Sequence, residues 1–185
     1  MKYIDTGIQD LWICEPDIFK DGRGHFFEAF NKKDFKSNTG LEVDFVQQNQ
    51  SKSAYGTLRG MHLQKGKDSQ AKLLRVIEGE VLDAVVDLRK DSPTFGKSYT
   101  VILSAENNRQ LFVPRNFAHG FLVLKPETAF VYSCDSYYQK SAELTLHYQD
   151  KKAAIEWPQI DGDQILSEKD NEGLDFEEVI AQMYG

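Results

Sequence analysis

The sequence predicts a mainly β, antiparallel sandwich or barrel. Short apolar runs of strand length recur roughly every 8–12 residues, with Gly, Pro, Asn and Asp between them. Almost no long segment has the 3.6-residue apolar period of a helix. With 185 residues, no internal repeat and no low-complexity linker, the chain is expected to form one domain over residues 1–185.

The first third of the chain is predicted to contain short elements. Residues 7–13 have the length and composition of a strand, and the two glycines in 21–24 predict a turn before an aromatic-rich strand at 26–30. A short charged helix is expected at 31–36, and the strand pattern resumes at Phe45.

The centre of the chain is rich in apolar runs. Two pairs of runs are each separated by three turn residues and are predicted to be hairpins: 72–77 with 81–88 around 78–80, and 122–124 with 128–134 around 125–127. Further strands are expected at 99–103 and 110–113.

The C-terminal tail differs from this pattern. Pro158 interrupts a mixed segment, residues 165–170 are predicted to be a polar loop, and residues 176–183 have the spacing of a short terminal helix.

Charge and composition limit the partners. The net charge of −7, from 22 basic and 29 acidic residues, argues against a broad nucleic-acid or anionic-membrane surface, although a local basic pocket for a phosphorylated ligand is compatible with it. Cys14 and Cys134 have no metal-type spacing and are too few for a disulfide scaffold. No signal-peptide core and no 18-residue apolar run is found, so a cytoplasmic protein is expected.

A polar run, residues 47–53, precedes Arg59-Gly60-Met61-His62-Leu63-Gln64, and Lys72 follows. Polar groups on sandwich strands need partners, so this concentration predicts a polar cavity, with a solvated loop as the alternative. Gln47 and Asn49 are two apart and should share a face. Arg59 and His62 are three apart, so either Gly60 hosts a bulge that turns both inward or one of the two residues lies outside the site.

A metal site is not predicted. Metal-binding barrels of the cupin type use a His-x-His pair, a later Glu and a third His, but Gln64 stands two positions after His62, and His119 is alone on its strand. His25 and His147 lie in charged surroundings, so three protein ligands cannot be assembled.

The alternative is a metal-free site for proton transfer. His62 or His119 is a natural base near neutral pH, and Tyr132 can return a proton to a carbanion. Lys72 and Arg59 can stabilise an oxyanion or bind phosphate. Each of these residues also has a purely structural interpretation, as a core or edge side chain.

Several motifs occur together in a fixed order: 19–24 with Phe27-Glu28, 47–51, 58–64, Lys72, 86–89 with 92–96, Pro114 with 117–121, Tyr132, Tyr138, Trp157-Pro158 and 166–170. Together they resemble the nucleotide-sugar 3,5-epimerases, above all the dTDP-4-dehydrorhamnose 3,5-epimerase family. The resemblance implies a cofactor-free, cupin-like jelly roll. It also implies a homodimer that epimerises a dTDP-4-keto-6-deoxyhexose at C3 and C5 in the route to dTDP-L-rhamnose.

The resemblance also implies roles. His62 would be the base assisted by Asp170, Lys72 would stabilise the enolate, and Tyr132 would reprotonate the opposite face. Arg23, Arg59 and Lys169 would contact the diphosphate and sugar. Further pocket positions would be Phe19, Phe26, Glu28, Gln47, Asn49, His119, Tyr138 and Glu143. The segment around Phe26 and Glu28 would reach into the partner subunit's site.

Two departures from the family pattern stand out. Glu143 is followed by Leu144–Tyr148 instead of the usual Gly-Ile and Trp-Asp, which puts its placement in question. Asn116 stands where the family has Gly, and Asn tolerates a left-handed backbone better than most residues. A 3-only or 5-only epimerase, or a non-catalytic sugar-nucleotide binding module, stays open as an alternative.

Overall fold

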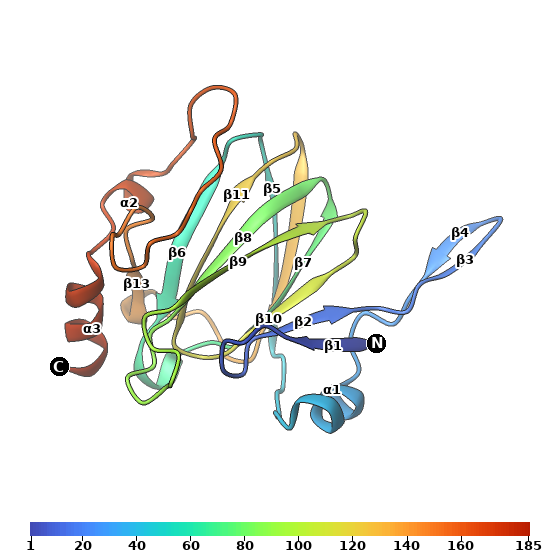
Figure 1. Ribbon diagram of the computed structural model, residues 1–185, viewed down its shortest axis with the longest axis horizontal. Helices are drawn as coiled ribbons and strands as arrows, with labels where there is room; N and C mark the ends of the chain where they lie inside the picture. The colour runs from blue at the N-terminus through green and yellow to red at the C-terminus, as the bar shows by residue number, and fades with distance from the viewer.

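Strands that follow one another in the chain lie mostly in opposite sheets. The computed structural model describes all residues 1–185, and its two main sheets are antiparallel throughout (Figure 1). The first sheet has the order β1 (Lys2–Asp5), β2 (Trp12–Glu15), β10 (Gln110–Val113), β7 (Lys72–Glu78), β12 (Thr128–Cys134), β5 (Gln47–Ser53). The second has the order β13 (Glu143–Thr145), β6 (Leu58–Gln64), β11 (Phe117–Val123), β8 (Glu80–Asp87), β9 (Ser98–Ser104). This arrangement is a jelly-roll sandwich, which confirms the predicted fold class.

Both predicted central hairpins are wrong. β7 pairs with β10 and β12, whereas β8 pairs with β9 and β11, so Glu78–Glu80 carries the chain from one sheet to the other. The turn at 125–127 likewise connects β11 to β12 across the sandwich. A turn motif shows where the chain reverses, but the partner of each strand is set by which face it can bury.

The space between the sheets is filled at one end by apolar side chains. A cluster of 14 buried residues includes Leu74 of β7, Val85 of β8, Phe121 of β11 and Phe130 of β12. The rings of Phe121 and Phe130 stack with their centroids 4.4 Å apart. This packing fixes the separation of the two sheets, and the other end of the same space is polar.

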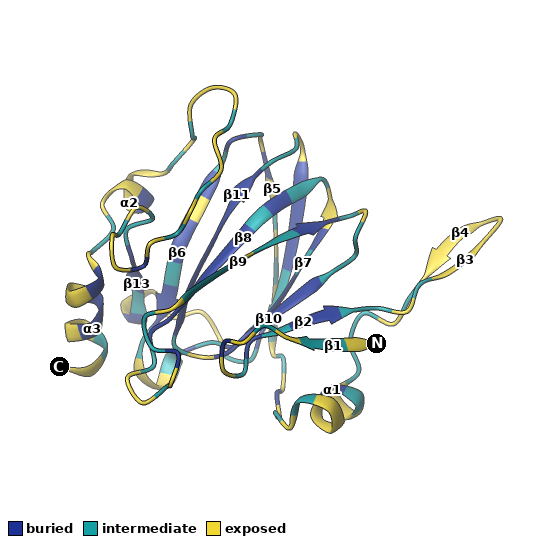
Figure 2. Ribbon diagram, in the orientation of Figure 1, coloured by how far each residue is buried: buried dark blue, intermediate teal, exposed yellow.

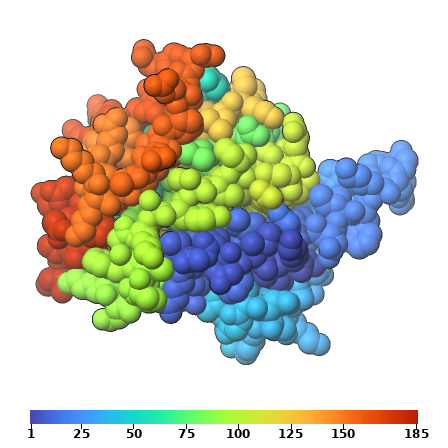
Figure 3. Space-filling view, in the orientation of Figure 1, coloured from blue at the N-terminus to red at the C-terminus, as the bar shows by residue number.

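The N-terminal segment places a hairpin outside the sandwich. β3 (Phe19–Asp21) and β4 (Gly24–Phe26) pair only with each other, and every residue in them is exposed (Figure 2). In the space-filling view the hairpin extends from the body as an arm (Figure 3). The predicted turn at 21–24 is present, and the strand predicted after it is confirmed only in part, because β4 ends at Phe26 and residues 27–30 join no sheet.

The predicted strand at 7–13 is displaced, whereas the predicted helix near residue 31 is present. The strand expected at 7–13 is displaced to β2, because residues 7–10 form the turn between β1 and β2. The short charged helix is confirmed as α1 (Lys32–Thr39), capped by the Asn31 side chain and ended by Gly40 at a φ of 74°. Asn116 has a φ of 63°, so it adopts the left-handed conformation for which Asn is suited.

The C-terminal segment covers the outer face of the second sheet with α3 (Phe176–Tyr184) (Figure 1). Asp175 and Glu178 form a reciprocal capping box, and Phe176, Val179 and Ile180 are buried against Met61 and Val86, so the predicted terminal helix is confirmed. The predicted loop at 165–170 is partly wrong, because α2 (Glu168–Asn171) begins after Ser167, whose side chain caps it. No helix of the chain is long and apolar enough to span a membrane.

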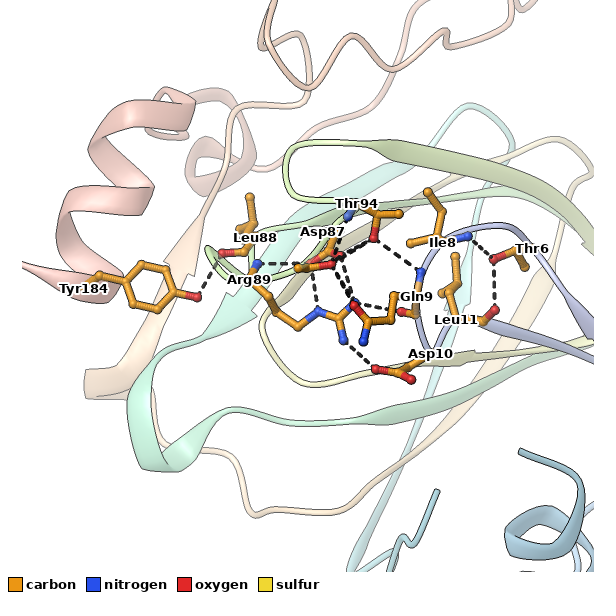
Figure 4. Close-up of polar contacts among 11 residues, drawn as sticks. Thr6, Ile8, Gln9, Asp10, Leu11, Asp87, Leu88, Arg89, Thr94 and Tyr184 are labelled. Carbon is orange, nitrogen blue, oxygen red and sulfur yellow. Dashed lines mark hydrogen bonds and ion pairs between the residues drawn. The ribbon is translucent and has the colours of Figure 1, made fainter. Parts of the chain in front are cut away.

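A polar network holds the loop after β8 against the turn between β1 and β2 (Figure 4). The carboxylate of Asp87 is fully buried and accepts hydrogen bonds from Arg89, Ser92 and Thr94 at 2.6–2.9 Å. Arg89 extends the network to Asp10 at 2.9 Å. Three donor side chains satisfy one buried charge, so this network stabilises the contact between the two loops.

Candidate active site

A cavity of about 390 Å³ lies between the two sheets at their polar end. The first sheet contributes Gln47, Asn49, Lys72 and Tyr132, and the second contributes Arg59, His62, His119 and Glu143. The remaining lining residues are Gln50, Ser51, Leu63, Gln64, Gln70, Phe121 and Tyr138. The predicted polar cavity is therefore present, and Gln47 and Asn49 share its face as predicted.

His62 is held by a carboxylate from the distant tail. Nε2 of His62 lies 2.6 Å from Oδ1 of Asp170, whose side chain is 5% exposed. Ser167 Oγ donates to Oδ2 of Asp170 at 2.7 Å, and the Gly60 N–H reaches Oδ1 at 3.4 Å. Burial by itself raises the pKa of Asp170, but these donors outweigh it and lower the pKa below its usual value. The carboxylate is thus ionised and accepts the Nε2 proton of His62, leaving Nδ1 as the basic nitrogen.

The tail reaches His62 because its backbone bonds to the start of β6. The Leu58 N–H donates to the Ile165 carbonyl, and the Ile165 N–H donates to the Gly56 carbonyl, both at 2.9 Å. Ser167 then caps α2, which places Asp170 on the first turn of that helix. Two backbone hydrogen bonds and the Ser167 cap therefore position the Asp170 carboxylate next to the His62 imidazole.

Arg59 and His62 both line the cavity because β6 is bulged between them. His62 pairs with His119 and Arg59 pairs with Phe121, so three steps on β6 match two on β11. Gly60 has a φ of 129°, and a Cβ there would lie 2.4 Å from Cα of Gly120. Of the two alternatives that the sequence left open, the irregular strand at Gly60 is the one observed, and it requires the close approach of two glycines.

Lys72 and Tyr132 lie on the wall opposite His62. Lys72 is half-buried, has no carboxylate within ion-pair distance, and burial lowers its pKa. Tyr132 is half-buried against the apolar cluster, and burial raises its pKa. The first sheet therefore presents an unpaired amine and a neutral phenol to the cavity.

A second imidazole–carboxylate pair lies beside the first. Nε2 of His119 is 2.9 Å from Oδ2 of Asp83, which is fully buried. His119 and His62 are direct partners in the β11–β6 register, so the two rings come from adjacent strands. Sequence reasoning did not identify Asp83. The clue available was its position between Val81 and Val85, where a strand buries every second side chain.

The rim of the cavity is held by ion pairs and amides. Glu143 binds Lys169 at 2.6 Å and accepts a hydrogen bond from the Tyr138 hydroxyl at 3.1 Å. Burial raises the pKa of Glu143, but Lys169 and Tyr138 outweigh it and lower the pKa overall. The altered sequence after Glu143 does not displace it, because β13 pairs Glu143 with Gln64 of β6.

Four predicted contacts lie away from this cavity. Phe19, Arg23 and Phe26 are on the projecting hairpin, and Glu28 follows it; all four are exposed. Arg23 pairs with Asp21 at 2.6 Å, and Phe19 lies opposite Phe26 in the hairpin register. No three His, Cys, Asp or Glu side chains are grouped closely enough to share a metal ion.

Comparisons with known proteins agree over nearly the whole chain. The family model for dTDP-4-dehydrorhamnose 3,5-epimerase matches residues 5–178. The epimerase of that name from Shigella flexneri is 49% identical over 95% of this chain and 96% of its own length. The crystal structure of the enzyme of that name from Elizabethkingia anophelis has a TM-score of 0.92 and 50% identity, over 96% of this chain and 97% of that one.

A third relative was solved with a sugar nucleotide bound. The dTDP-6-deoxy-D-glucose-3,5-epimerase of Legionella pneumophila, in complex with dTDP-4-keto-L-rhamnose, has a TM-score of 0.93 and 43% identity, over 98% of this chain and 96% of that one. Sequence and fold thus agree over almost the full length of each protein compared. The chain belongs to the dTDP-4-dehydrorhamnose 3,5-epimerase family.

Proposed function

We propose that this chain converts dTDP-4-dehydro-6-deoxy-D-glucose to dTDP-4-dehydro-L-rhamnose by inverting C3 and C5. The observation that carries the proposal is that a base and an acid face one cavity from opposite sheets. His62 belongs to β6 and Tyr132 to β12, so a sugar ring between the sheets would have one of them on each face. Inversion requires removal of a proton from one face and its return to the other.

In the proposed mechanism the 4-keto group acidifies the protons on C3 and C5. Nδ1 of His62 removes a proton, and Asp170 stabilises the imidazolium that forms. The electrons move onto the 4-oxygen, and Lys72 stabilises this enolate, since no carboxylate of the chain lies within ion-pair distance of its amine. Tyr132 then donates its phenolic proton to the opposite face of the same carbon.

Residues in the cavity and at its rim are suited to contact the substrate. Arg59 and Lys169 carry positive charge at the cavity and its edge, which suits the diphosphate and sugar. Gln47, Asn49 and His119 supply hydrogen bonds inside the cavity, while Tyr138 offers an exposed aromatic ring at its lip.

We further propose a homodimer in which each projecting hairpin completes the other subunit's site. Phe19 and Phe26 are 65% and 70% exposed and line one surface together with Arg23, so the two rings bury little apolar area in the isolated subunit. Two aromatic rings and a guanidinium suit a nucleoside diphosphate.

Dimerisation and site sharing can be tested together. Sedimentation should give twice the chain mass. A His62→Ala chain has an intact hairpin, and an Arg23→Ala chain has an intact base. If sites are shared, mixing the two by refolding should restore activity above either parent. Activity no higher than the average of the parents would contradict sharing.

The reaction is tested by solvent-deuterium incorporation into dTDP-4-keto-6-deoxyglucose, followed by NMR. Label at both C3 and C5, with the product trapped by a reductase, is the expected result. Label at one carbon would identify a single-site epimerase instead. His62→Ala should abolish labelling while still binding dTDP, whereas the matched His147→Ala change, outside the cavity, should leave labelling unaltered.

A further inference from the structure

The two imidazole–carboxylate pairs of the cavity have different surroundings. Asp170 receives hydrogen bonds from Ser167 and Gly60 in addition to His62. Asp83 has only one hydrogen-bond partner, His119, which contacts Oδ2. The other oxygen, Oδ1, is buried without any hydrogen bond. A carboxylate anion has about four acceptor positions, so Asp83 as an anion would leave most of its charge unsatisfied.

The environment of Asp83 is also apolar. On β8 its side chain shares a face with Val81 and Val85, which belong to the buried cluster. The ring of His119 lies beside those of Phe121 and Phe130, with centroids 6.3 and 6.1 Å away. An unpaired oxygen costs least in such surroundings when it is the carbonyl oxygen of a neutral carboxylic acid.

The charged groups nearby do not form a complete ion pair with Asp83. Lys72 of β7 and His62 of β6 are the other titratable groups that act on the Asp83–His119 pair. Lys72 favours an ionised Asp83, but no salt bridge joins them. Burial is the largest influence on both members of the pair: it raises the pKa of Asp83 and lowers the pKa of His119.

We propose that Asp83 is a protonated carboxylic acid that donates to Nε2 of His119, so that His119 presents Nδ1–H to the cavity as a hydrogen-bond donor. Nδ1 of His119 has no hydrogen-bond partner in the chain. Only two side-chain nitrogen or oxygen atoms are both buried and without a partner, Trp12 Nε1 and Asp83 Oδ1, so Nδ1 of His119 is not a buried atom. Nδ1 is therefore accessible from the cavity that His119 lines.

Under the function proposed above, on which this step rests, His119 donates to the sugar's 4-oxygen beside Lys72. The two neighbouring imidazoles then have opposite tautomers. His62 carries its proton on Nε2 and is a base through Nδ1, while His119 carries its proton on Nδ1 and is a donor. Asp83 is a positioning residue, since it acts through His119.

The tautomers can be measured on the unmodified, ligand-free protein. The chain has four histidines, so ¹⁵N-labelled histidine gives few signals, and His62→Asn and His119→Gln identify the two of interest. At neutral pH we expect protonated Nδ1 in His119 and protonated Nε2 in His62. A protonated Nε2 in His119 would overturn the proposal.

The protonation of Asp83 has an independent readout. Infrared spectroscopy should detect the C=O stretch of a buried, protonated carboxyl group, and this band should disappear in Asp83→Asn. The matched Asp170→Asn change removes an ionised carboxylate and should leave the band in place. A wild-type spectrum without such a band would refute the proposal.

Kinetics connect the tautomer to catalysis. Asn can donate its amide N–H to Nε2, so Asp83→Asn should keep the His119 tautomer and most of the activity. Asp83→Leu cannot donate, and kcat should fall about 100-fold with little change in KM. Equal kcat losses in the two variants would contradict the proposed role. Absence of turnover in the wild type would refute the proposed function instead, and would leave the NMR and infrared results valid.

Discussion

Oδ1 of Asp170 lies 2.6 Å from Nε2 of His62, although 108 positions separate the two residues in the chain. Against the effect of burial, hydrogen bonds from His62, Ser167 and Gly60 lower the pKa of Asp170, so the ionised carboxylate holds one imidazole tautomer and supports the positive charge that proton abstraction creates. The base of the proposed reaction thus depends on a residue near the C-terminus.

Replacing Asp170 by Asn should lower kcat by about 100-fold or more, because an amide does not stabilise the imidazolium and permits the wrong tautomer. KM should change little, since Asp170 does not line the cavity. Steady-state kinetics on the variant measure this. Glu168→Gln, an exposed neighbour on α2, is the control and should have wild-type kcat. An Asp170→Asn enzyme with normal kcat would remove the pair from the mechanism.

Replacing Tyr132 by Phe should separate the two halves of the reaction. The base is untouched, so solvent deuterium should still enter the substrate, while formation of the inverted product should fall by at least about 100-fold. Because burial raises the pKa of Tyr132, the phenol stays protonated above the usual Tyr range, and kcat should not decline on its account below about pH 10. Equal loss of exchange and product would assign the proton to another group.

Replacing Gly120 by Ala should destabilise the fold. A Cβ there would lie 2.7 Å from both the Arg59 carbonyl oxygen and Sδ of Met61, where the bulged strand passes. We expect the free energy of unfolding to drop by about 1–3 kcal/mol, measured by denaturant titration. Gly22 lies on the exposed hairpin with open space around it, so Gly22→Ala should lower the free energy of unfolding by well under half of that amount. Similar values for both variants would mean that the close approach is not needed.

Replacing Asp87 by Ala should destabilise the protein at neutral pH by about 3–5 kcal/mol, because Arg89 would lose a buried partner. Burial raises the pKa of Asp87, but Arg89, Ser92 and Thr94 outweigh it and lower the pKa overall. A lowered folded-state pKa contributes stability above the unfolded-state value, about 3.9, and loses it as pH falls.

The difference in stability between wild type and Asp87→Ala should therefore become smaller below about pH 4. Thermal unfolding of both proteins across pH measures this. Asp91→Ala, at an exposed position of the same loop, should stay within about 0.5 kcal/mol of wild type at every pH. A constant gap down to the lowest pH would show that the ionisation of Asp87 does not contribute.

The β class and the terminal helix were predictable from local pattern. Apolar spacing acts within a few positions, whereas the bulge at Gly60 was one of two alternatives, the other being that Arg59 or His62 lies outside the site. Strand pairing was not predictable in this way. The turn at 78–80 has the composition of a hairpin, yet it crosses between sheets, because the partner of β7 is chosen by burial across the whole sandwich.

The site shows the same division. Family motifs indicated His62, Lys72 and Tyr132, and the structure brings these three residues to one cavity. Asp83 was missed because a carboxylate inside an apolar strand gives no motif, and its importance depends on a neighbour on another strand. Phe19 and Arg23 were indicated by motif, but a single subunit holds them apart from the cavity.

The crossing of consecutive strands between sheets has a consequence for folding. Each wall of the cavity is assembled from segments distant in sequence, so native contacts have large sequence separations and folding is expected to be slow. The two walls and Asp170 extend over residues 47–170, so no short fragment of the chain contains the whole site. Loss of ligand binding should therefore report global rather than local unfolding, and a saturating nucleotide should raise the midpoint of thermal unfolding.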